Sequence, residues 1–223
     1  MPESIVFDAL PLRQRKFART KLTLLDATLE SLRSRSLDEV RVAELCAAAD
    51  ISPASFFNYF PQKADVLVYH VQLWSLEIAW HAERLARKRG GLAAIEEVFA
   101  LTAREVVRNP EAMAEIIAAQ ARMQSPPAMA DVTDAERLLA FPELDGIELV
   151  RIQDLESILT PFIARAIEAE ELPSRISRRI VASGLMALFF GMPIVLRRAG
   201  PKGLEVAYRR QLRIFWAGLN AEQ

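Results

Sequence analysis

The sequence predicts an all-α protein, and two observations carry this prediction. Apolar residues recur every three or four positions in almost every segment, which is the period of an amphipathic helix. No run of alternating apolar and polar residues is longer than a few positions, so no segment is typical of a strand. Prolines, glycines and serines separate the helical segments and predict about ten helices.

Small helices are expected first and longer ones after them. The first small helix ends at Ser36, the second spans Val40–Ala49 and the third spans Pro53–Tyr59. The longer helices are expected at residues 63–89, 91–109, 111–124, 147–171, 174–198 and 202–219. The proline-containing segment 125–146 is expected to be a long loop with a short helix inside it.

Composition excludes several classes of protein. The 223 residues are 52% hydrophobic with 28 Lys+Arg against 29 Asp+Glu, which excludes a disordered chain. A single cysteine excludes a disulfide framework and a cysteine-based zinc cluster. The first twelve residues have neither the basic start nor the long apolar run of a signal peptide, so a cytoplasmic protein is expected.

The longest uncharged stretch, residues 180–196, must be weighed as a membrane span. Its 17 residues fall short of the roughly 20 that a bilayer requires. It also contains four residues that suit a packed or bent helix: Ser183, Gly184, Gly191 and Pro193. A buried helix of a globular domain is therefore expected.

Charge is distributed unevenly although the whole chain has a net charge of −1. Residues 13–67 hold nine Lys/Arg and seven acidic residues, whereas residues 68–223 hold 19 and 20. Five of the nine basic residues lie between Arg13 and Lys21. This arm is where a nucleic-acid footprint is expected, and the alternative is an ordinary solvated helix start.

The segment from residue 40 to residue 60 has the pattern of a helix-turn-helix. The second helix places Val42, Leu45, Cys46 and Ala49 on one face. Only Asp50-Ile51-Ser52 separates it from the third helix, for which Ser52 is a favourable N-cap and Pro53 a favourable first residue. In a helix-turn-helix the later of the two helices, which is the third helix of this chain, enters the major groove of DNA.

The residue types of the third helix suit that role. Phe56 and Phe60 are expected to anchor it to the core, while its opposite face points outward. Hydroxyls and Lys63 suit phosphate contacts, and Asn58 suits a bidentate pair with adenine. The predicted DNA-contacting residues are Arg41, Val42, Ser52, Pro53, Ala54, Ser55, Phe57, Asn58, Tyr59 and Lys63. The alternative is a small helical bundle with no DNA to bind.

Residues 19–67 resemble the amino-terminal domain of the tetracycline-repressor (TetR) family of transcriptional regulators. The resemblance rests on three spaced motifs: Leu25-Asp26-Ala27-x-Leu29-Glu30-x-Leu32, Val42-x-x-Leu45-x-x-x-Ala49-x-Ile51-Ser52 and Ser55-Phe56-Phe57-x-Tyr59-Phe60-x-x-Lys63-x-x-Val66-Leu67. It implies a DNA-binding domain over residues 13–62 and an effector-binding, dimerising domain over residues 63–223. It further implies a ligand-responsive regulator, expected to be a repressor, that binds double-stranded operator DNA as a homodimer.

The chain departs from the family pattern at five positions. Ser36, Asp50 and Ala54 stand where the family usually has glycine. Asp tolerates the left-handed backbone conformation better than most residues, so Asp50 is expected to make the turn. Arg41 stands where threonine is common, and Phe57 where a tyrosine usually offers its hydroxyl to a phosphate. Arg41 is expected to replace that contact.

Small residues predict where the chain dimerises. Ser183, Ala187 and Gly191 recur at i, i+4 and i+8 in the most apolar helix, where another helix can approach closely. We expect the interface on helices 147–171 and 174–198, together with 202–219, because two half-sites on DNA require a two-fold axis. Packing within the chain is the alternative.

A pocket for a small, largely apolar effector is expected in the second domain. Its candidate lining residues are His70, Trp74, Glu77, His81, Phe99, Arg104, Met123, Phe162, Met186 and Phe190. The two histidines are three turns apart, so they do not share a metal ion without help from elsewhere, and no metal or cofactor is expected. No enzyme signature is present, and an all-helical interaction scaffold without DNA binding is the competing interpretation.

Overall fold

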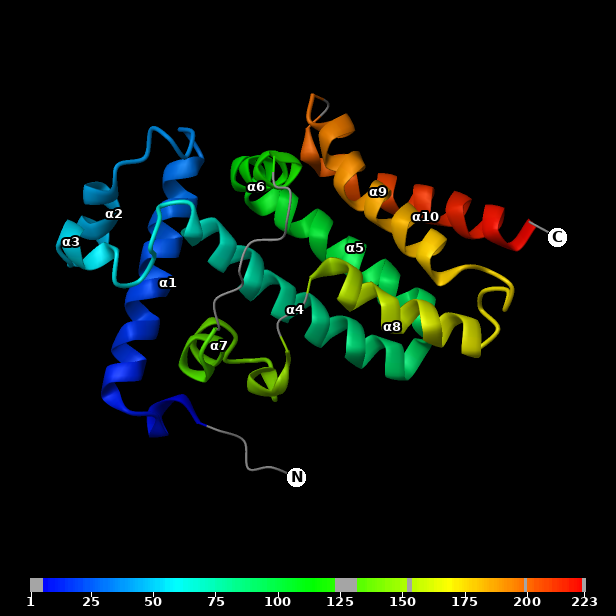
Figure 1. Cartoon of the computed structure of the whole chain (residues 1–223), viewed down its shortest axis with the longest axis horizontal. Coiled ribbons are helices and arrows are strands. Elements are labelled where there is room, and N and C mark those ends of the chain that lie inside the picture. Colours follow the sequence, from blue (N-terminus) through cyan, green and yellow to red (C-terminus); the bar gives the residue numbers. More distant parts are fainter. Residues whose placement is uncertain (1–5, 123–131, 152–153, 199, 222–223) are drawn as a thin grey trace. The chain divides into compact units, whose positions relative to one another are not determined.

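The computed structural model describes residues 6–122, 132–151, 154–198 and 200–221. These residues form ten α-helices and three short 3-10 helices, with no strand among them (Figure 1). The α-helices are α1 (Leu12–Leu32), α2 (Val42–Ala48), α3 (Pro53–Phe56), α4 (Asp65–Arg89), α5 (Gly91–Arg108), α6 (Pro110–Arg122), α7 (Asp134–Ala140), α8 (Leu155–Glu168), α9 (Arg178–Leu196) and α10 (Leu204–Ala221). The 3-10 helices are η1 (Phe7–Ala9), η2 (Ile147–Leu149) and η3 (Pro201–Gly203). The all-α prediction is confirmed.

The chain divides into two compact units. Unit 1 combines residues 1–77 with residues 111–152, and unit 2 combines residues 78–110 with residues 153–223. The long helix α4 contributes to both. In unit 1, α1 packs against α2 and α7, and α2 packs against α3. In unit 2, α5 packs against α8 and α10, and α9 packs against the same two helices. The predicted functional division after residue 62 remains a prediction.

Three predicted helix boundaries are wrong for local reasons. α1 ends at Leu32, because the backbone N–H and hydroxyl of Ser36 both bond the Glu39 carboxylate at 2.8 Å and form a turn before α2. These two bonds also lower the pKa of Glu39. α8 begins at Leu155 and not at residue 147, since Asp154 caps it by accepting the N–H of Ser157 at 2.7 Å. α9 begins at Arg178 and not at residue 174.

The short helix expected inside segment 125–146 is α7. The hydroxyl of Thr133 accepts the N–H of Glu136, and the Glu136 carboxylate accepts the N–H of Thr133 at 2.8 Å. This reciprocal capping box satisfies two backbone donors that a helix start otherwise leaves without partners. It stabilises a helix of only seven residues.

Unit 2 has an aromatic core built from three helices. The ring of Phe99 on α5 lies 5.7 Å from that of Phe189 on α9 and 4.9 Å from that of Tyr208 on α10, both edge-on. The Tyr208 hydroxyl donates to the backbone carbonyl of Phe189 at 2.6 Å. Its burial raises the pKa of Tyr208. Because the buried hydroxyl has a partner, the core keeps its packing without an uncompensated polar group.

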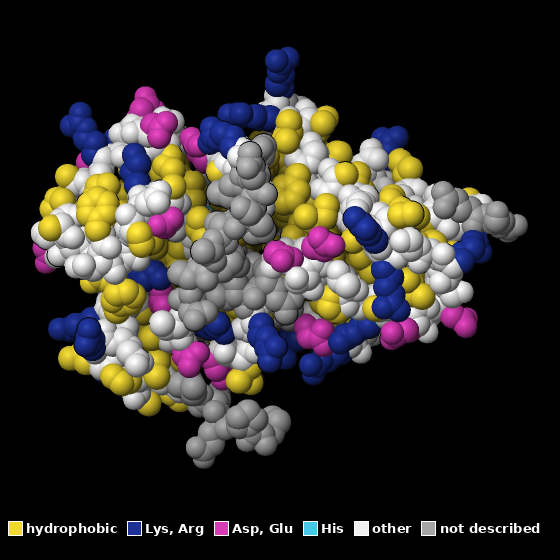
Figure 2. Space-filling view, viewed as in Figure 1, with side chains coloured by type: hydrophobic (Ala, Val, Ile, Leu, Met, Phe, Trp, Pro, Cys, Tyr) yellow, Lys and Arg dark blue, Asp and Glu magenta, His cyan; other side chains and the backbone are white. Residues whose placement is uncertain are grey.

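The prediction that residues 180–196 form a buried helix is wrong for the isolated chain. By length and composition alone α9 passes as a membrane span, and only 22% of its most apolar stretch is buried. One face, with Val181, Leu185 and Phe189, packs inside unit 2. Another face exposes large apolar residues, of which Val195 is 72% exposed. Figure 2 shows apolar side chains on the surface over α9.

Gly91 lets α5 begin against the backbone of α8. A Cβ at this position would lie 2.2 Å from the carbonyl oxygen of Phe162 and 2.6 Å from the amide nitrogen of Ala166. Both are backbone atoms, so neither helix can accommodate the extra atom by a side-chain rotation. The small residue is therefore required by the packing of these two helices.

We expect Gly91→Ala to lower the free energy of unfolding by about 1–3 kcal/mol, the usual cost of overpacking. Gly218→Ala is the matched control, because a Cβ at Gly218 on α10 meets nothing within 4 Å. It should raise stability by up to about 1 kcal/mol through helix propensity. Urea unfolding of both variants measures the difference, and a Gly91→Ala variant as stable as the wild type would contradict the close approach of the helices.

Candidate nucleic-acid interface

The turn between α2 and α3 depends on a left-handed residue. Asp50 has φ 52°, the conformation that the sequence predicted for it. With Asp50 in this conformation, the N–H of Ile51 bonds the carbonyl of Cys46 at 3.1 Å. This bond is typical of a Schellman-type helix end, where the chain reverses direction and satisfies a terminal carbonyl. The turn therefore forms here without glycine.

α3 starts as the sequence predicts but is regular over fewer residues. Ser52 caps it by accepting the N–H of Ser55 at 3.2 Å, and Pro53 occupies the first turn. The helix has four regular residues and then tightens into turns, with bonds from Asn58 to Ser55 and from Tyr59 to Phe56. The predicted helix over Pro53–Tyr59 is thus an α-helical turn that continues as tighter turns. We call residues 12–60 the reading head.

Aromatic residues anchor α3 as expected. Phe56 is fully buried, and its ring centroid lies 5.8 Å from that of Phe60. Phe60 in turn lies 5.6 Å from Tyr69 on α4. On α2, Leu45 and Cys46 face the same core. Burial raises the pKa of the Cys46 thiol, so this lone cysteine is a packing residue and not a nucleophile.

The opposite face of α3 is presented to solvent. Pro53, Ala54, Phe57 and Asn58 are exposed, and the Phe57 side chain is 54% exposed. A large apolar ring that stays in water on such a small helix is unusual for a monomeric protein surface. Thymine methyl groups and sugar edges are apolar surfaces of the kind that cover such a ring in a DNA groove. An exposed amide beside it supplies a donor and an acceptor.

The remaining predicted contact residues border this face. Arg41 is the exposed N-cap residue of α2, and Val42 follows it, half-buried. The hydroxyls of Ser52 and Ser55 lie 2.9 Å apart and share one hydrogen bond, which leaves the other O–H free to donate to a phosphate oxygen. The ring of Tyr59 stacks at 4.7 Å on that of Phe17 from α1.

Lys63 is held by the protein itself. Its ammonium donates to the carbonyl of Val40 at 2.9 Å and to that of Asp38 at 3.2 Å. Lys63 therefore fastens the start of α4 to the loop before α2. An ammonium has three donors, so one remains for a phosphate. Its first role in the structure is to position the loop that leads to Arg41.

Fewer basic residues of the predicted arm, Arg13 to Lys21, face solvent than the five that the sequence contains there. Arg15 pairs with Asp8 at 3.3 Å and donates to the carbonyl of Leu10 at 3.1 Å. Lys21 is buried and pairs with Glu136. Arg13, Lys16 and Arg19 are exposed. The prediction of five basic residues for a nucleic-acid footprint is thus wrong for Lys21, and three residues of the arm face solvent.

Two short helices with a tight left-handed turn, a buried aromatic anchor and an exposed second helix define a helix-turn-helix DNA-binding protein. Residues 24–69 match the family model described as bacterial regulatory proteins, tetR family. Residues 24–69 therefore form the DNA-binding domain that is typical of the TetR family of transcriptional regulators. No curated protein matches the chain.

Known structures share the whole fold at low sequence identity. FadR of Thermus thermophilus, a TetR-family repressor in complex with lauroyl-CoA, is 18% identical and has a TM-score of 0.61, with 88% of this chain and 93% of that chain covered. FadR of Bacillus subtilis in complex with stearoyl-CoA is 14% identical, with a TM-score of 0.59 and coverage of 91% and 98%. GusR of Salmonella enterica is 17% identical, with a TM-score of 0.55 and coverage of 91% and 95%. At these identities the likeness shows the fold alone.

The residues predicted to line an effector pocket lie in different surroundings. Four of them lie on α4: His70, Trp74, Glu77 and His81. Five lie on the helices of unit 2: Phe99, Arg104, Phe162, Met186 and Phe190. Met123 lies outside the described residues. Phe99 and Phe162 are fully packed core residues, whereas Met186 and Phe190 are half-buried on α9.

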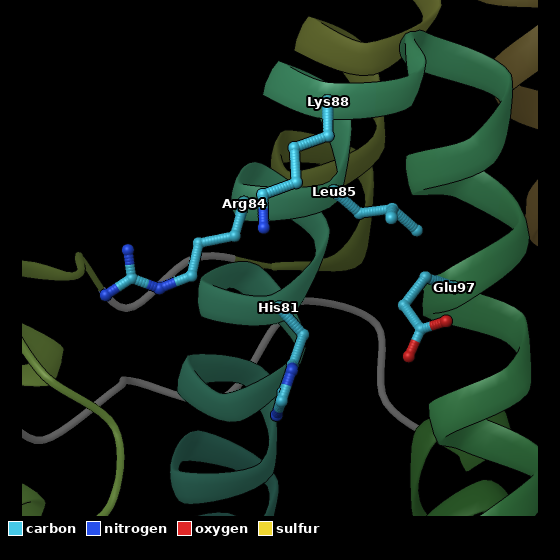
Figure 3. Close-up of a pocket in the computed structure, with 5 residues that line it drawn as sticks. All are labelled: His81, Arg84, Leu85, Lys88 and Glu97. Atoms are coloured by element: carbon cyan, nitrogen blue, oxygen red, sulfur yellow. The ribbon is translucent and has the colours of Figure 1, made fainter.

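One pocket among the described residues lies in unit 2 and has a volume of about 250 Å³. Its lining residues are His81, Arg84, Leu85, Lys88 and Glu97. Figure 3 shows Leu85 and Glu97 reaching into the space between α4 and α5, with Arg84 directed away from Glu97. The Arg84 guanidinium lies 3.9 Å from the centre of the Trp80 ring. Of the predicted residues, only His81 is part of this lining.

Glu136 and Lys21 are the residues that sequence reasoning missed. The Thr133-x-x-Glu136 spacing is a readable capping-box signal. The partner of Glu136 lies 115 positions away on α1, and nothing local in the sequence indicates that pairing. The glutamate was therefore identifiable as a cap but not as one half of a buried ion pair.

Proposed function

We propose that this regulator is a ligand-responsive repressor that acts in the cytoplasm and binds operator DNA as a homodimer. Residues 13–62 read the DNA, and residues 63–223 bind the effector and dimerise. The observation that carries the proposal is the solvent-exposed face of α3, with Phe57 and Asn58 held outward by the buried Phe56. This face supplies an apolar contact and an amide at the place where a recognition helix meets base edges.

The contacts divide into two kinds. Arg41, Ser52, Ser55, Tyr59 and Lys63 are proposed to bind phosphates and to set the register. Phe57 and Asn58 are proposed to read bases, while Pro53 and Ala54 permit a close approach of the backbone. Val42, the half-buried first residue of α2, follows Arg41 and is proposed to border the same contact.

We expect the purified protein to retard a DNA fragment from upstream of its own gene in a gel-shift titration. Asn58→Ala should lose about 1–3 kcal/mol of operator binding, because a bidentate amide–adenine pair has this value. Gln120→Ala on α6 is the matched control, since it removes an exposed amide outside the reading head. Absence of retardation by the wild-type protein at low salt would contradict DNA binding, and equal binding by both variants would remove Asn58 from the base contacts.

The proposed dimer interface lies on α9 with α10 beside it. Ser183 and Ala187 are exposed, and a Cβ at Gly191 meets nothing within 4 Å. Packing within the chain uses another small residue of the helix, because a Cβ at Gly184 would lie 2.6 Å from the Phe215 ring on α10. The stripe predicted from the sequence is therefore available to a second copy of the chain.

Exposed apolar residues continue this surface. On α9 they are Ile180, Ile194 and Val195, and on α10 they are Val206 and Ile214. Large apolar side chains exposed on two helices that pack together favour an association site there. Two-fold pairing of such helices suits an operator with two half-sites about 34–36 Å apart.

Ala187→Arg should convert the dimer into a monomer at micromolar concentration, because a buried, unpaired guanidinium in a helix–helix seam costs several kcal/mol. Ala118→Arg on α6 is the control, because this exposed residue lies outside the helices expected in the interface, and the variant should remain dimeric. Sedimentation velocity distinguishes the two states. A monomeric wild-type protein, or a dimeric Ala187→Arg variant, would contradict this interface.

We propose an effector with an apolar body and an anionic end. The pocket beside α4 is cationic, since Arg84 and Lys88 line it against Glu97, which Arg104 already pairs at 2.8 Å. Its 250 Å³ is below the roughly 300–1,000 Å³ of complete ligand sites, so it suits the anionic end of a longer molecule. The FadR proteins with this fold bind lauroyl-CoA and stearoyl-CoA, which have this general chemistry.

Lauroyl-CoA is the probe, and quenching of Trp fluorescence measures its binding because Trp80 lies under Arg84. Lys88→Glu should weaken binding about tenfold or more, since a charge-assisted hydrogen bond contributes about 1.5–3 kcal/mol. Lys202→Glu is the control, a charge reversal on exposed η3. Equal loss in both variants, or no binding to the wild type, would contradict the anion pocket and leave operator binding untouched.

A further inference from the structure

A buried ion pair joins α1 of the reading head to α7 of the same unit. The Lys21 ammonium lies 2.6 Å from a carboxylate oxygen of Glu136, and the two side chains are 9% and 0% exposed. Burying two charges is costly unless further contacts compensate them. The surroundings of both groups supply such contacts.

Aromatic faces surround the ammonium of Lys21. Its nitrogen lies 4.0 Å from the centre of the Tyr69 ring, 5.4 Å from that of Phe60 and 5.9 Å from that of Phe17. The negative faces of aromatic rings attract a desolvated cation. Burial raises the pKa of Tyr69, and the negative charge of Glu136 raises it further. The site is therefore built for a cation at residue 21 and an anion at residue 136.

Hydrogen bonds from Thr133 hold the carboxylate of Glu136 in place. Its second oxygen accepts the backbone N–H of Thr133 at 2.8 Å and also the Thr133 hydroxyl. The next residue, Arg137, donates to the carbonyls of Val132 and Glu148 at 2.9 Å and to that of Val150 at 2.6 Å. These bonds tie residues 132–150 into one piece, which we call the brace. Glu136 projects from a fixed support.

Aromatic side chains connect the Lys21–Glu136 ion pair with α3. The rings of Phe17 and Phe60 both lie near the Lys21 ammonium. The Phe17 ring stacks on that of Tyr59, and Phe60 is the residue after Tyr59 in the chain. Tyr59 and Phe60 end the tightened turns of α3. A change in the position of Lys21 therefore changes the packing under the exposed face that carries Phe57 and Asn58.

We propose that the brace supports the reading head and belongs to the same DNA-reading body. Lys21 and Glu136 are then positioning residues, which hold the reading head in the geometry that operator binding requires. The inference rests on the proposed DNA binding. The compact unit that contains α1–α3 also contains residues 111–152, which agrees with a DNA-reading body larger than its helix-turn-helix. The pair fixes α1 against α7 by direction and charge, which apolar contact does not do.

The experiment separates positioning from stability in the full-length dimer. In Lys21→Met/Glu136→Met both charges are removed, and apolar replacement of a buried pair is often neutral or stabilising. We expect an unchanged or higher Tm, together with operator affinity at least tenfold weaker. Amide hydrogen exchange, measured without DNA, should become faster at Tyr59 and Phe60. The exposed pair Glu30–Arg33 on α1, 3.0 Å apart, provides the control Glu30→Gln/Arg33→Gln, which should change neither readout.

Operator affinity and exchange both equal to wild type in a stable double variant would overturn the proposal, since the pair would then be structural only. If the double variant does not fold, Thr133→Ala loosens Glu136 alone, and we expect a loss of affinity of a few-fold with faster exchange at the same amides. An unchanged Thr133→Ala variant would count against the proposal. A wild-type protein that binds no operator would contradict the proposed function, whereas the exchange readout still tests the brace.

Discussion

The burial of Phe56 and Phe60 is the constraint on which the reading head depends. A helix with four regular residues is far too short to be stable alone, because helix nucleation is unfavourable and few bonds repay it. Its shape must come from tertiary packing. The two rings provide this packing on one side and so force Phe57 and Asn58 to the other. The exposure of Phe57 and Asn58, on which the proposed base contacts depend, therefore follows from the burial of Phe56 and Phe60.

The basic residues of the reading head and its exit fall into two groups, those that face solvent and those that bind other parts of the protein. The net charge of −1 for the whole chain says little about DNA, because the basic residues near the amino terminus are divided between solvent and interior. Arg13, Lys16 and Arg19 face solvent, as residues that attract phosphates must. Lys21 and Lys63 bind within the protein and contribute to shape. A moderate dependence of operator affinity on salt follows from this division, since each phosphate contact adds to the salt slope.

Local signals in the sequence predicted local structure well. The Asp50 turn, the Ser52 cap, the buried Phe56 and the short helix α7 all depend on residues within a few positions of one another. Features that depend on distant partners were not predictable in this way. The charge of Lys21 indicated a surface contact until its partner 115 residues away was known, and α9 reads as a core helix although one of its faces is exposed. Composition reports how apolar a helix is, but only packing reports which face is covered.

Two carboxylates from the later part of the chain touch the reading head, and their contacts differ in strength. Glu115 on α6 accepts the N–H of Leu37 at 3.4 Å, in the partly exposed turn between α1 and α2. Glu136 on α7 holds Lys21 at 2.6 Å inside the unit. A long, partly exposed hydrogen bond contributes little to stability, whereas separating a buried pair leaves an uncompensated charge. The Leu37 contact is therefore the weaker attachment of the reading head to the later part of unit 1, and the Lys21–Glu136 pair is the stronger one.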